Sequence, residues 1–277
     1  NKSKTKAAIG LQHLKREKRI LTQTSHPFIV HMYAHFSDKY NVYMIMEFVQ
    51  GGDLFNRQKR KPLFPGEAQF YTACVIDALD YLHSLSIAYR DLKTENILID
   101  NKGYVKLTDF GFAKKINKKG RTYTTVGTLE YLAPEVIRKQ GYTKAIDFWS
   151  LGILLYELIC NKTPFGNILH SDFMLQNAIL HKTPDMQTLS DRLSAGRNEE
   201  IDNDLCAIHP YYGFDRINPN KDAAVDIVSK LLAKNPKERL GSEAKNHKYW
   251  GGVDWSLLKS CGYKPWFIPT ISTVDDT

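Results

Sequence analysis

The stretch Tyr89-Arg90-Asp91-Leu92-Lys93-Thr94-Glu95-Asn96 places an aspartate and an asparagine five residues apart. The apolar residues 97–99 and 104–107 that follow predict two short strands, joined by a polar turn that ends in glycine. Asp109-Phe110-Gly111 comes after the second strand. Taken alone, Asp91 and Asn96 would be interpreted as ordinary turn residues, because both residue types are common in turns.

A third motif, Ala133-Pro134-Glu135, lies further along the chain and changes that interpretation. The three motifs occur in the order and at the approximate spacing of the catalytic template of protein kinases. Phosphoryl transfer requires a hydroxyl group positioned in line and cations that neutralise charge on the phosphate oxygens. Oxygen ligands such as those of Asn96 and Asp109 suit Mg²⁺. The sequence therefore predicts a phosphoryl-transfer enzyme.

In these three motifs the chain resembles the AGC-group serine/threonine protein kinases, and within that group it is most similar to cAMP-dependent protein kinase catalytic subunits. The resemblance extends from Glu17 to about residue 269, and its most group-specific features are Tyr89 before Arg90 and the runs at residues 109–114 and 127–132. Thr94 and Leu129 depart from the group, because proline is usual at both positions. Leu129 lies in the loop that meets the peptide, so this departure bears on peptide preference.

The resemblance implies an α+β, bilobal protein kinase fold with a small β-rich N-lobe, truncated here, and a large helical C-lobe. It divides the chain into a partial N-lobe at residues 1–49, a hinge at 50–53, a C-lobe at 54–255 with an insertion at about 184–221, and the start of a C-terminal tail at 256–277. The spacing of apolar residues predicts helices at residues 11–21, 67–85 and 145–160 and a hairpin of strands at 28–36 and 41–49. The polar composition of residues 184–221 predicts loops rather than core.

A glycine-rich phosphate loop and a strand lysine belong to the kinase template, and neither is found in this sequence. The family spacing places the lysine just before Asn1. We therefore expect that the chain lacks the first strands of the small lobe and that residues 1–277 alone bind Mg-ATP weakly.

The resemblance assigns a role to each matching position of the active site. Asp91 would orient the substrate hydroxyl, Lys93 would stabilise the transferred phosphate, and Thr128 would brace both. Asn96 and Asp109 would hold Mg²⁺. The residues expected to form the ATP site are Glu17, Met46, Glu47, Val49, Asp53, Glu95, Leu98, Thr108 and Asp109.

Thr124 stands where related kinases are phosphorylated, and a phosphate there would add roughly −1.5 to −2 charges. The residues expected to bind this phosphate are His13, Arg90 and Lys114. His13 and Glu17 lie four residues apart on one helix face, so ordering the first would help to place the second. Thr122 and Thr125 remain alternative phosphorylation sites.

Carboxylates at the matching positions imply that the enzyme selects arginine-containing peptides, because a guanidinium group pairs well with a carboxylate. The residues expected to bind the peptide are Asp53, Glu95, Leu129, Glu130, Leu132 and Glu157. Three further residues are expected to act structurally: Glu135 in an ion pair with Arg239, and Asp147 as an anchor of the catalytic loop.

The net charge of +8 is spread thinly along the chain, which argues against a nucleic-acid partner. The four cysteines form no C-x-x-C pair, and no apolar run is long enough to span a membrane, so we expect a cytoplasmic or nuclear protein. The expected partners are protein substrates with basic motifs and a regulatory subunit or inhibitor peptide. The alternative function is that of a pseudokinase-like scaffold or inactive fragment, against which the intact Asp91, Lys93, Asn96 and Asp109 argue.

Overall fold

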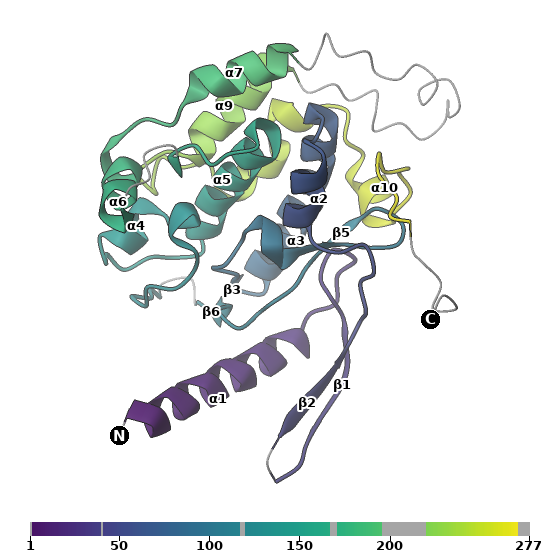
Figure 1. Ribbon diagram of the computed structural model, residues 1–277, viewed down its shortest axis with the longest axis vertical. Coiled ribbons are helices and arrows are strands. Elements are labelled where there is room, and N and C mark those ends of the chain that lie inside the picture. The colour runs from purple at the N-terminus through teal and green to yellow at the C-terminus, as the bar shows by residue number, and fades with distance from the viewer. Residues whose placement is uncertain (1, 40, 117–119, 167–170, 196–219, 271–277) are drawn as a thin grey trace.

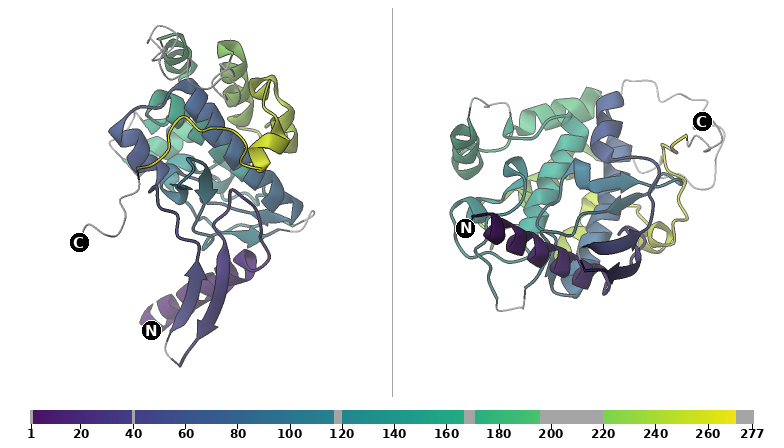
Figure 2. Two further views of the ribbon diagram at one scale, coloured as in Figure 1. Left: turned by 90° about the vertical axis from the view of Figure 1, so that its right-hand side faces the viewer. Right: turned by 60° about the horizontal axis from the view of Figure 1, so that its bottom comes forward.

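The computed structural model describes residues 2–39, 41–116, 120–166, 171–195 and 220–270 (Figure 1). A large helical part contains most of these residues, and a small part made of one long helix and one hairpin extends from it (Figure 2). The helices are α1 (Lys2–Leu21), α2 (Leu54–Arg60), α3 (Pro65–Ser84), α4 (Pro134–Ile137), α5 (Ile146–Cys160), α6 (Asp172–His181), α7 (Met186–Ala195), α9 (Lys221–Leu231) and α10 (Trp255–Lys259). The strands are β1 (Met32–Ser37), β2 (Val42–Met46), β3 (Ile87–Ala88), β4 (Ile97–Ile99), β5 (Val105–Leu107) and β6 (Lys114–Lys115). Short 3₁₀ turns occur at η1 (Thr94–Asn96), η2 (Leu129–Tyr131), η5 (Ser242–Asn246) and η6 (Lys248–Trp250).

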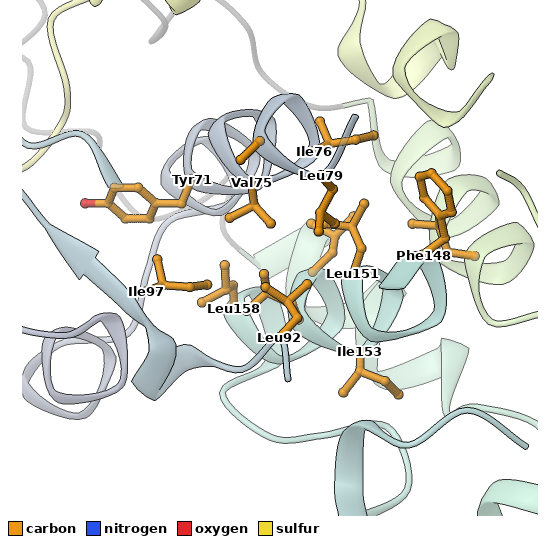
Figure 3. Close-up of a cluster of buried hydrophobic side chains, with 14 of the residues drawn as sticks. Tyr71, Val75, Ile76, Leu79, Leu92, Ile97, Phe148, Leu151, Ile153 and Leu158 are labelled. Atoms are coloured by element: carbon orange, nitrogen blue, oxygen red, sulfur yellow. The ribbon is translucent and has the colours of Figure 1, made fainter. Parts of the chain in front are cut away.

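The core of the large part lies around α3 and α5, which pack against each other. Helix α3 begins at Pro65, whose missing N–H is not needed there, and the Glu67 carboxylate accepts a hydrogen bond from the Phe64 N–H at 3.1 Å. Helix α5 ends at Asn161 in the left-handed conformation (φ 56°), a common way to stop a helix. Its sequence is almost entirely apolar, so nearly every face of the helix is buried. Figure 3 shows members of this core that are at most 1% exposed: Val75, Ile76, Leu79, Leu151, Ile153 and Leu158.

The small part is joined to this core through the segment between α1 and β1. Ile20 and Leu21 at the end of α1 are buried in the common core. The backbone then runs beside β5, where Val30 N–H donates to Leu107 O at 3.0 Å and Leu107 N–H donates to Phe28 O at 2.9 Å. Strands β1 and β2 form an antiparallel hairpin with an irregular register between Met32 and Ala34.

Several element boundaries differ from the sequence predictions. The strand expected from residue 28 begins only at Met32, because the preceding residues bind β5. The helix expected from residue 11 begins at Lys2, since its first turns are rich in lysine and alanine, which favour helix without an apolar repeat. The strand expected at residues 41–49 is shorter and corresponds to β2. The helices expected at 67–85 and 145–160 are found as α3 and α5, with boundaries shifted by one or two residues.

The prediction that residues 184–221 are loop-rich is wrong for their first part. Residues Met186–Ala195 form helix α7, in which Leu189 and Leu193 are buried. These two leucines lie four residues apart on one face, which packs toward α5 and α9. Residues 196–219 lie outside the described part of the chain.

After α10 the chain returns over the large part and lies against α3 and the turn between β4 and β5. The Trp266 ring lies over Gly66, and Phe267 O approaches Gly103 so closely that a β-carbon there would be only 2.1 Å away. Gly103 also has φ of 88°, so this turn requires glycine for two reasons.

The α+β architecture predicted from the sequence is confirmed, with a small strand-bearing part and a large helical part. The domain boundaries proposed above stay predictions. Within the described residues, no helix combines the length and apolar character that crossing a membrane would require.

Candidate active site

Asp91 lies in the loop between β3 and η1, and several polar groups converge on its carboxylate, which is 3% exposed. Asn96 Nδ2 donates to Asp91 Oδ2 at 2.9 Å, and Thr128 Oγ1 lies 3.5 Å from Asp91 Oδ1. Lys93 Nζ lies 3.5 Å from Asp91 Oδ2 and donates to Thr128 Oγ1 at 3.1 Å. The structure thus brings together the four residues that the sequence predicted to be catalytic.

Asp147, in the first turn of α5, is fully buried and holds the backbone directly before Asp91. Its Oδ1 accepts a hydrogen bond from Arg90 N–H at 2.8 Å, and its Oδ2 accepts one from Tyr89 N–H at 2.9 Å. His83 Nε2 lies 2.7 Å from the same Oδ2. A buried carboxylate needs such donors, and here they also fix Arg90 in the left-handed region, at φ of 72°.

Asp109 and Asn96 lie at adjacent chain segments, since Thr108 N–H donates to Asn96 O at 3.0 Å. The exposed Asp109 carboxylate accepts a hydrogen bond from Gly111 N–H at 3.1 Å. Glu17 on α1 faces it: burial and the negative charge of Asp109 raise the pKa of Glu17, while the Phe110 N–H lowers it. Among the described side chains, no lysine lies within ion-pair distance of Glu17.

These groups fit the Mg²⁺ that the sequence predicted. Glu17 and Asp109 are two carboxylates whose mutual repulsion a cation would relieve. The donors are oxygen atoms, which magnesium prefers, and Asp109 is open to solvent. Asn96 and Asp109 are the residues that the sequence predicts would hold the metal, and this assignment stays a prediction.

The predicted hinge, residues 50–53, pairs with β4. Gly51 N–H donates to Ile99 O and Ile99 N–H donates to Gly52 O, both at 2.8 Å, and Asp53 lies opposite Leu98 in an isolated bridge. Leu98, which the sequence predicts to form the floor of a nucleotide site, is half-buried at this edge.

Asp53 itself caps helix α2. Its Oδ1 accepts from Asn56 N–H and its Oδ2 accepts from Asn56 Nδ2, both at 2.7 Å. The contacts predicted for Asp53 with ribose and peptide would therefore compete with, or share, this cap.

The remaining nucleotide-site candidates lie on either side of this linker. Glu47 N–H donates to His31 O at 2.8 Å and the Glu47 carboxylate lies 3.0 Å from Lys106 Nζ, so the Glu47 carbonyl is the group it can offer to a base. Met46 packs against the core and Val49 is half-buried. Thr108 O accepts a hydrogen bond from the Tyr89 hydroxyl.

Basic residues gather around the predicted phosphorylation site. Thr124 is exposed, and its hydroxyl lies 3.2 Å from that of Thr122, which accepts a hydrogen bond from Lys114 Nζ at 3.0 Å. Arg90 donates through Nε to Phe112 O at 2.6 Å. The His13 ring lies edge-on against the Phe112 ring, with centroids 5.7 Å apart. Thr122 is 2% exposed, so Thr124 and Thr125 are the accessible hydroxyls.

A group of glutamates lies beside the catalytic loop. Burial raises the pKa of Glu157 to about 7, helped by the charges of Glu95 and Glu130 and opposed by a hydrogen bond from the Tyr131 hydroxyl. Burial and the charge of Glu95 also raise the pKa of Glu130. Carboxylates that repel one another in this way form a site suited to a cationic side chain.

The loop that carries the apolar peptide-binding candidates packs against the catalytic loop. Leu129 and Leu132 are both partly buried against the core. Leu132 lines a small pocket with Asp91 and Thr128. Gly127 has φ of 104°, and a β-carbon at this position would lie only 2.8 Å from Arg90 O and 3.3 Å from Leu132, so the close approach of the two loops requires glycine.

Glu135 and Arg239 form a buried bidentate ion pair. Arg239 Nη1 donates to Glu135 Oε1 at 2.7 Å and Arg239 Nη2 donates to Oε2 at 2.9 Å. Arg239 also donates to Ala145 O and Ala233 O and lies over the Trp149 ring. This pair therefore joins α4, the start of α5 and the segment after α9.

Three residues of the site were not predicted from the sequence. The Tyr142 hydroxyl accepts from Arg90 Nη1 at 3.0 Å and donates to Thr124 O at 2.6 Å. Tyr131 donates to Glu157. Arg16 on α1 is close enough to Lys114 that burial, Arg90 and Arg16 together lower the Lys114 pKa. Tyr142 lies in no recognisable motif, and the group-specific run at residues 127–132 contains Tyr131 without indicating its contact with Glu157. Arg16 lies three residues after His13 on the predicted helix face and could have been found there.

The amino-acid sequence is similar to those of known protein kinases. The family model described as "Protein kinase domain" matches residues 1–250. A protein of Caenorhabditis elegans named "cAMP-dependent protein kinase, catalytic subunit-like" is 37% identical over 273 residues, covering 96% of this chain and 60% of that protein. The "cAMP-dependent protein kinase catalytic subunit" of Dictyostelium discoideum is 37% identical over 96% of this chain and 37% of its own length. The "cGMP-dependent protein kinase" of Toxoplasma gondii is 37% identical over 96% of this chain and 24% of its own length. The chain thus spans less than two thirds of the length of these relatives.

Proposed function

The chain belongs to the protein kinase family, and from this premise we propose that it transfers the γ-phosphate of ATP to serine or threonine hydroxyls in arginine-containing peptides. The observation that carries the proposal is the convergence of Lys93, Asn96 and Thr128 on the carboxylate of Asp91. The names of the relatives support the same reaction, since all three describe cyclic-nucleotide-dependent protein kinases.

In the proposed reaction, Asp91 accepts a hydrogen bond from the substrate hydroxyl and orients it in line with the phosphate. Asn96 and Thr128 fix the orientation of the Asp91 carboxylate, so the substrate hydroxyl approaches a base that is already oriented. Lys93, next to Asp91, offers a positive charge to the phosphate oxygens. Mg²⁺ held by Asn96 and Asp109 would supply further neutralisation of phosphate charge.

The proposed peptide preference is supported by the group formed by Glu95, Glu130 and Glu157. Burial and the negative charge of Glu95 raise the pKa of both Glu130 and Glu157, so ionisation of these two carboxyls has an energetic cost that a bound guanidinium would lower. This local concentration of negative charge supports the proposal of protein substrates with basic motifs, although the net charge of the chain is positive.

We further propose that phosphorylation at Thr124 activates the enzyme through the basic residues His13, Arg90 and Lys114. Control by cyclic nucleotides, through a regulatory subunit or an inhibitor peptide, is the extension that the names of the relatives suggest.

The test is transfer of radiolabelled phosphate from ATP to a serine peptide with upstream arginines, using the full-length protein phosphorylated at Thr124. Asp91→Asn should lower kcat by at least about a hundredfold, because general-base and orienting groups typically contribute that much. Asp191→Asn, on the exposed face of α7, is the matched control and should leave kcat unchanged. Absence of transfer by the unmodified sequence would overturn the enzyme proposal and favour a scaffold.

A further inference from the structure

A buried polar junction lies where the end of α1 meets α3, away from the groups that touch substrate in the proposed reaction. The side chain of Asp77 on α3 is 6% exposed and has two cationic or polar partners from distant parts of the chain. Its Oδ2 lies 3.1 Å from His26 Nε2, in the turn after α1, and its Oδ1 is paired with Lys245 Nζ of η5. Asp77 therefore connects the base of the small part to the C-terminal region.

The hydrogen bonds of His26 assign its protonation. Its Nδ1 faces the N–H of Phe28 at 3.3 Å, and since that group can only donate, Nδ1 must accept. Nε2 then carries the proton and donates to Asp77. Both nitrogens of a side chain that is only 2% exposed are thus used, and the direction of the ring is fixed.

The same ring is held on two further sides. It stacks on Tyr81 of α3, with centroids 5.0 Å apart and planes inclined by 25°. The Tyr81 hydroxyl accepts a hydrogen bond from Ser25 N–H at 2.9 Å. The turn that ends α1 is therefore attached to α3 by directional contacts, in addition to the apolar burial of Ile20 and Leu21.

The other contacts that the described side chains of α1 make with the large part lie at the candidate active site. They are the contact of His13 with Phe112, the proximity of Arg16 to Lys114 and that of Glu17 to Asp109 and Phe110. A helix rises about 1.5 Å per residue, so Glu17 lies only about 6 Å along the axis from Leu21. A change in direction at the base of α1 is therefore transmitted to Glu17.

We propose that Asp77 is a positioning residue, which through His26 sets the direction of α1 and so the placement of Glu17 against Asp109. The importance of Glu17 for phosphoryl transfer rests on the proposed function, but the mechanical part of the proposal does not. The two hydrogen bonds hold Asp77 ionised: although burial disfavours its charge, His26 and Lys245 lower its pKa below the usual value.

Because Asp77 has two partners, its role in stabilising the large part can be tested separately from its role in positioning α1. Lys245 binds the same carboxylate from η5 and also lies over the Trp255 ring, 4.5 Å from its centroid. In the part of the chain that the structure describes, it forms no ion pair or hydrogen bond with α1 or its turn. If Asp77 only stabilised the large part, loss of Lys245 and loss of His26 would have similar consequences. If it positions α1, only loss of His26 or of Asp77 itself would loosen that helix.

The experiment is amide hydrogen exchange on the full-length protein carrying Asp77→Leu, His26→Phe or Lys245→Met. His26→Phe keeps a ring that can stack on Tyr81 but removes the donor to Asp77. We expect Asp77→Leu and His26→Phe each to speed exchange at residues 18–24 by about tenfold, the usual effect of losing a buried hydrogen bond to a charged group. Lys245→Met should speed exchange around η5 and α10 and leave residues 18–24 unchanged.

Two further variants test the coupling itself. The double variant of Asp77→Leu with His26→Phe should exchange no faster at residues 18–24 than either single variant, because both remove the same interaction. Asp77→Asn retains an acceptor for His26 and should restore slow exchange there. Equal acceleration in Lys245→Met, or acceleration spread over α5 as much as α1, would overturn the proposal.

A kinetic measurement distinguishes this inference from the proposed function. In the peptide phosphorylation assay, His26→Phe should lower kcat several-fold with an unchanged KM for peptide, and Asp77→Asn should largely retain kcat. If the protein transfers no phosphate at all, the proposed function fails while the exchange result still decides the role of Asp77. If transfer occurs and exchange at residues 18–24 is insensitive to His26→Phe, the positioning role fails alone.

Discussion

At the scale of single residues, Glu157 offers a pH-dependent test of peptide recognition. Burial, with the charges of Glu95 and Glu130, raises its pKa to about 7, so it is only partly ionised at neutral pH. A guanidinium binds the ionised form, and therefore affinity for an arginine peptide should rise as pH increases toward 7 and level off above it. We expect the peptide KM to decrease about tenfold between about pH 5.5 and 6.5, because in this range the ionised fraction of Glu157 limits peptide binding.

Two variants distinguish the effect of Glu157 ionisation on the peptide KM from the effects of other titrating groups. Glu157→Gln should weaken binding and remove the rise in affinity below pH 7. Tyr131→Phe removes a hydrogen bond that favours the ionised carboxylate, so the same rise should move to higher pH. A pH profile of peptide KM that is the same in the unmodified protein and in Glu157→Gln would contradict the assignment.

The buried pair of Glu135 and Arg239 should be a strong determinant of stability. Removing one partner leaves the other charge buried, which typically costs about 3–5 kcal/mol of unfolding free energy. Arg239→Met should be the more harmful change, because Arg239 also donates to two backbone carbonyls and lies over Trp149. Denaturant titration of Glu135→Gln, Arg239→Met and the double variant would measure this.

The stability of the double variant of Glu135→Gln with Arg239→Met shows whether the two side chains act as a pair. With both charges gone, no unpaired charge remains buried, and we expect its loss of stability to be smaller than the sum of the two single losses. Additive losses would show that the two side chains act independently, contrary to the bidentate geometry.

The residues of the candidate site were predictable to different extents. Asp91, Asn96 and Asp109 lie in motifs whose order in the chain carries information, and the structure brings their segments together. Tyr142 and Arg16 carry no motif, because their roles depend on which turns of the fold meet near Thr124. The cap formed by Asp53 on α2 was not predicted, although an aspartate directly before a helix is a common N-cap residue.

At the scale of elements, α7 is the clearest test of the corrected secondary structure. Leu189 is fully buried on the face of α7 that meets α5 and α9. Leu189→Ala should lower the unfolding free energy by about 2–5 kcal/mol, as is usual for removing a buried leucine. Gln187→Ala, two residues before it and exposed, should change stability by less than about 0.5 kcal/mol, since it loses only a surface hydrogen bond to Asp191.

Thermal or denaturant unfolding of both variants provides the measurement. Equal small effects would mean that residues 186–195 do not pack on the core and that the loop prediction was right after all. Unequal effects, with Leu189→Ala much the larger, would support a helix with one buried face.

Elements differed in how well the sequence predicted them, and burial explains the difference. Helix α5 is apolar on almost every face, so its pattern is continuous and its limits were predicted to within one residue. Helix α7 places only Leu189 and Leu193 in the core, so polar residues dominate its composition and obscure the pattern. The segment at residues 28–31 has strand-like composition, but it pairs with β5 through isolated hydrogen bonds, which depend on tertiary contacts.

At the scale of the whole molecule, α1 and the large part meet across a concentration of positive charge. Lys114 and Arg90 belong to the large part, whereas Arg16 belongs to α1, and burial together with both arginine charges lowers the pKa of Lys114. This repulsion opposes close contact between α1 and the large part. A phosphate on the exposed Thr124, whose hydroxyl lies 3.2 Å from the Thr122 hydroxyl that Lys114 binds, would replace the repulsion by attraction.

Phosphorylation of Thr124 should therefore stabilise the molecule by joining α1 to the large part. A gain of about 1–2 kcal/mol, reasonable for new charge-assisted hydrogen bonds, corresponds to a rise in Tm of about 2–8 °C for a domain of this size. Because the interaction is electrostatic and partly exposed, the rise should shrink as salt concentration increases. Differential scanning calorimetry of the phosphorylated and unphosphorylated forms at two salt concentrations would measure it.

Arg16→Gln provides the matched control, because it removes a charge from α1 and leaves Arg90 and Lys114 in the large part. Without phosphate this variant should be as stable as the unmodified protein or slightly more stable, since one source of repulsion is gone. With phosphate it should gain less in Tm, and exchange of α1 amides should slow less than in the unmodified phosphorylated protein. An undiminished gain in Arg16→Gln would show that the phosphate is bound by the large part alone, and phosphorylation would then order the segment around Thr124 without drawing α1 toward it.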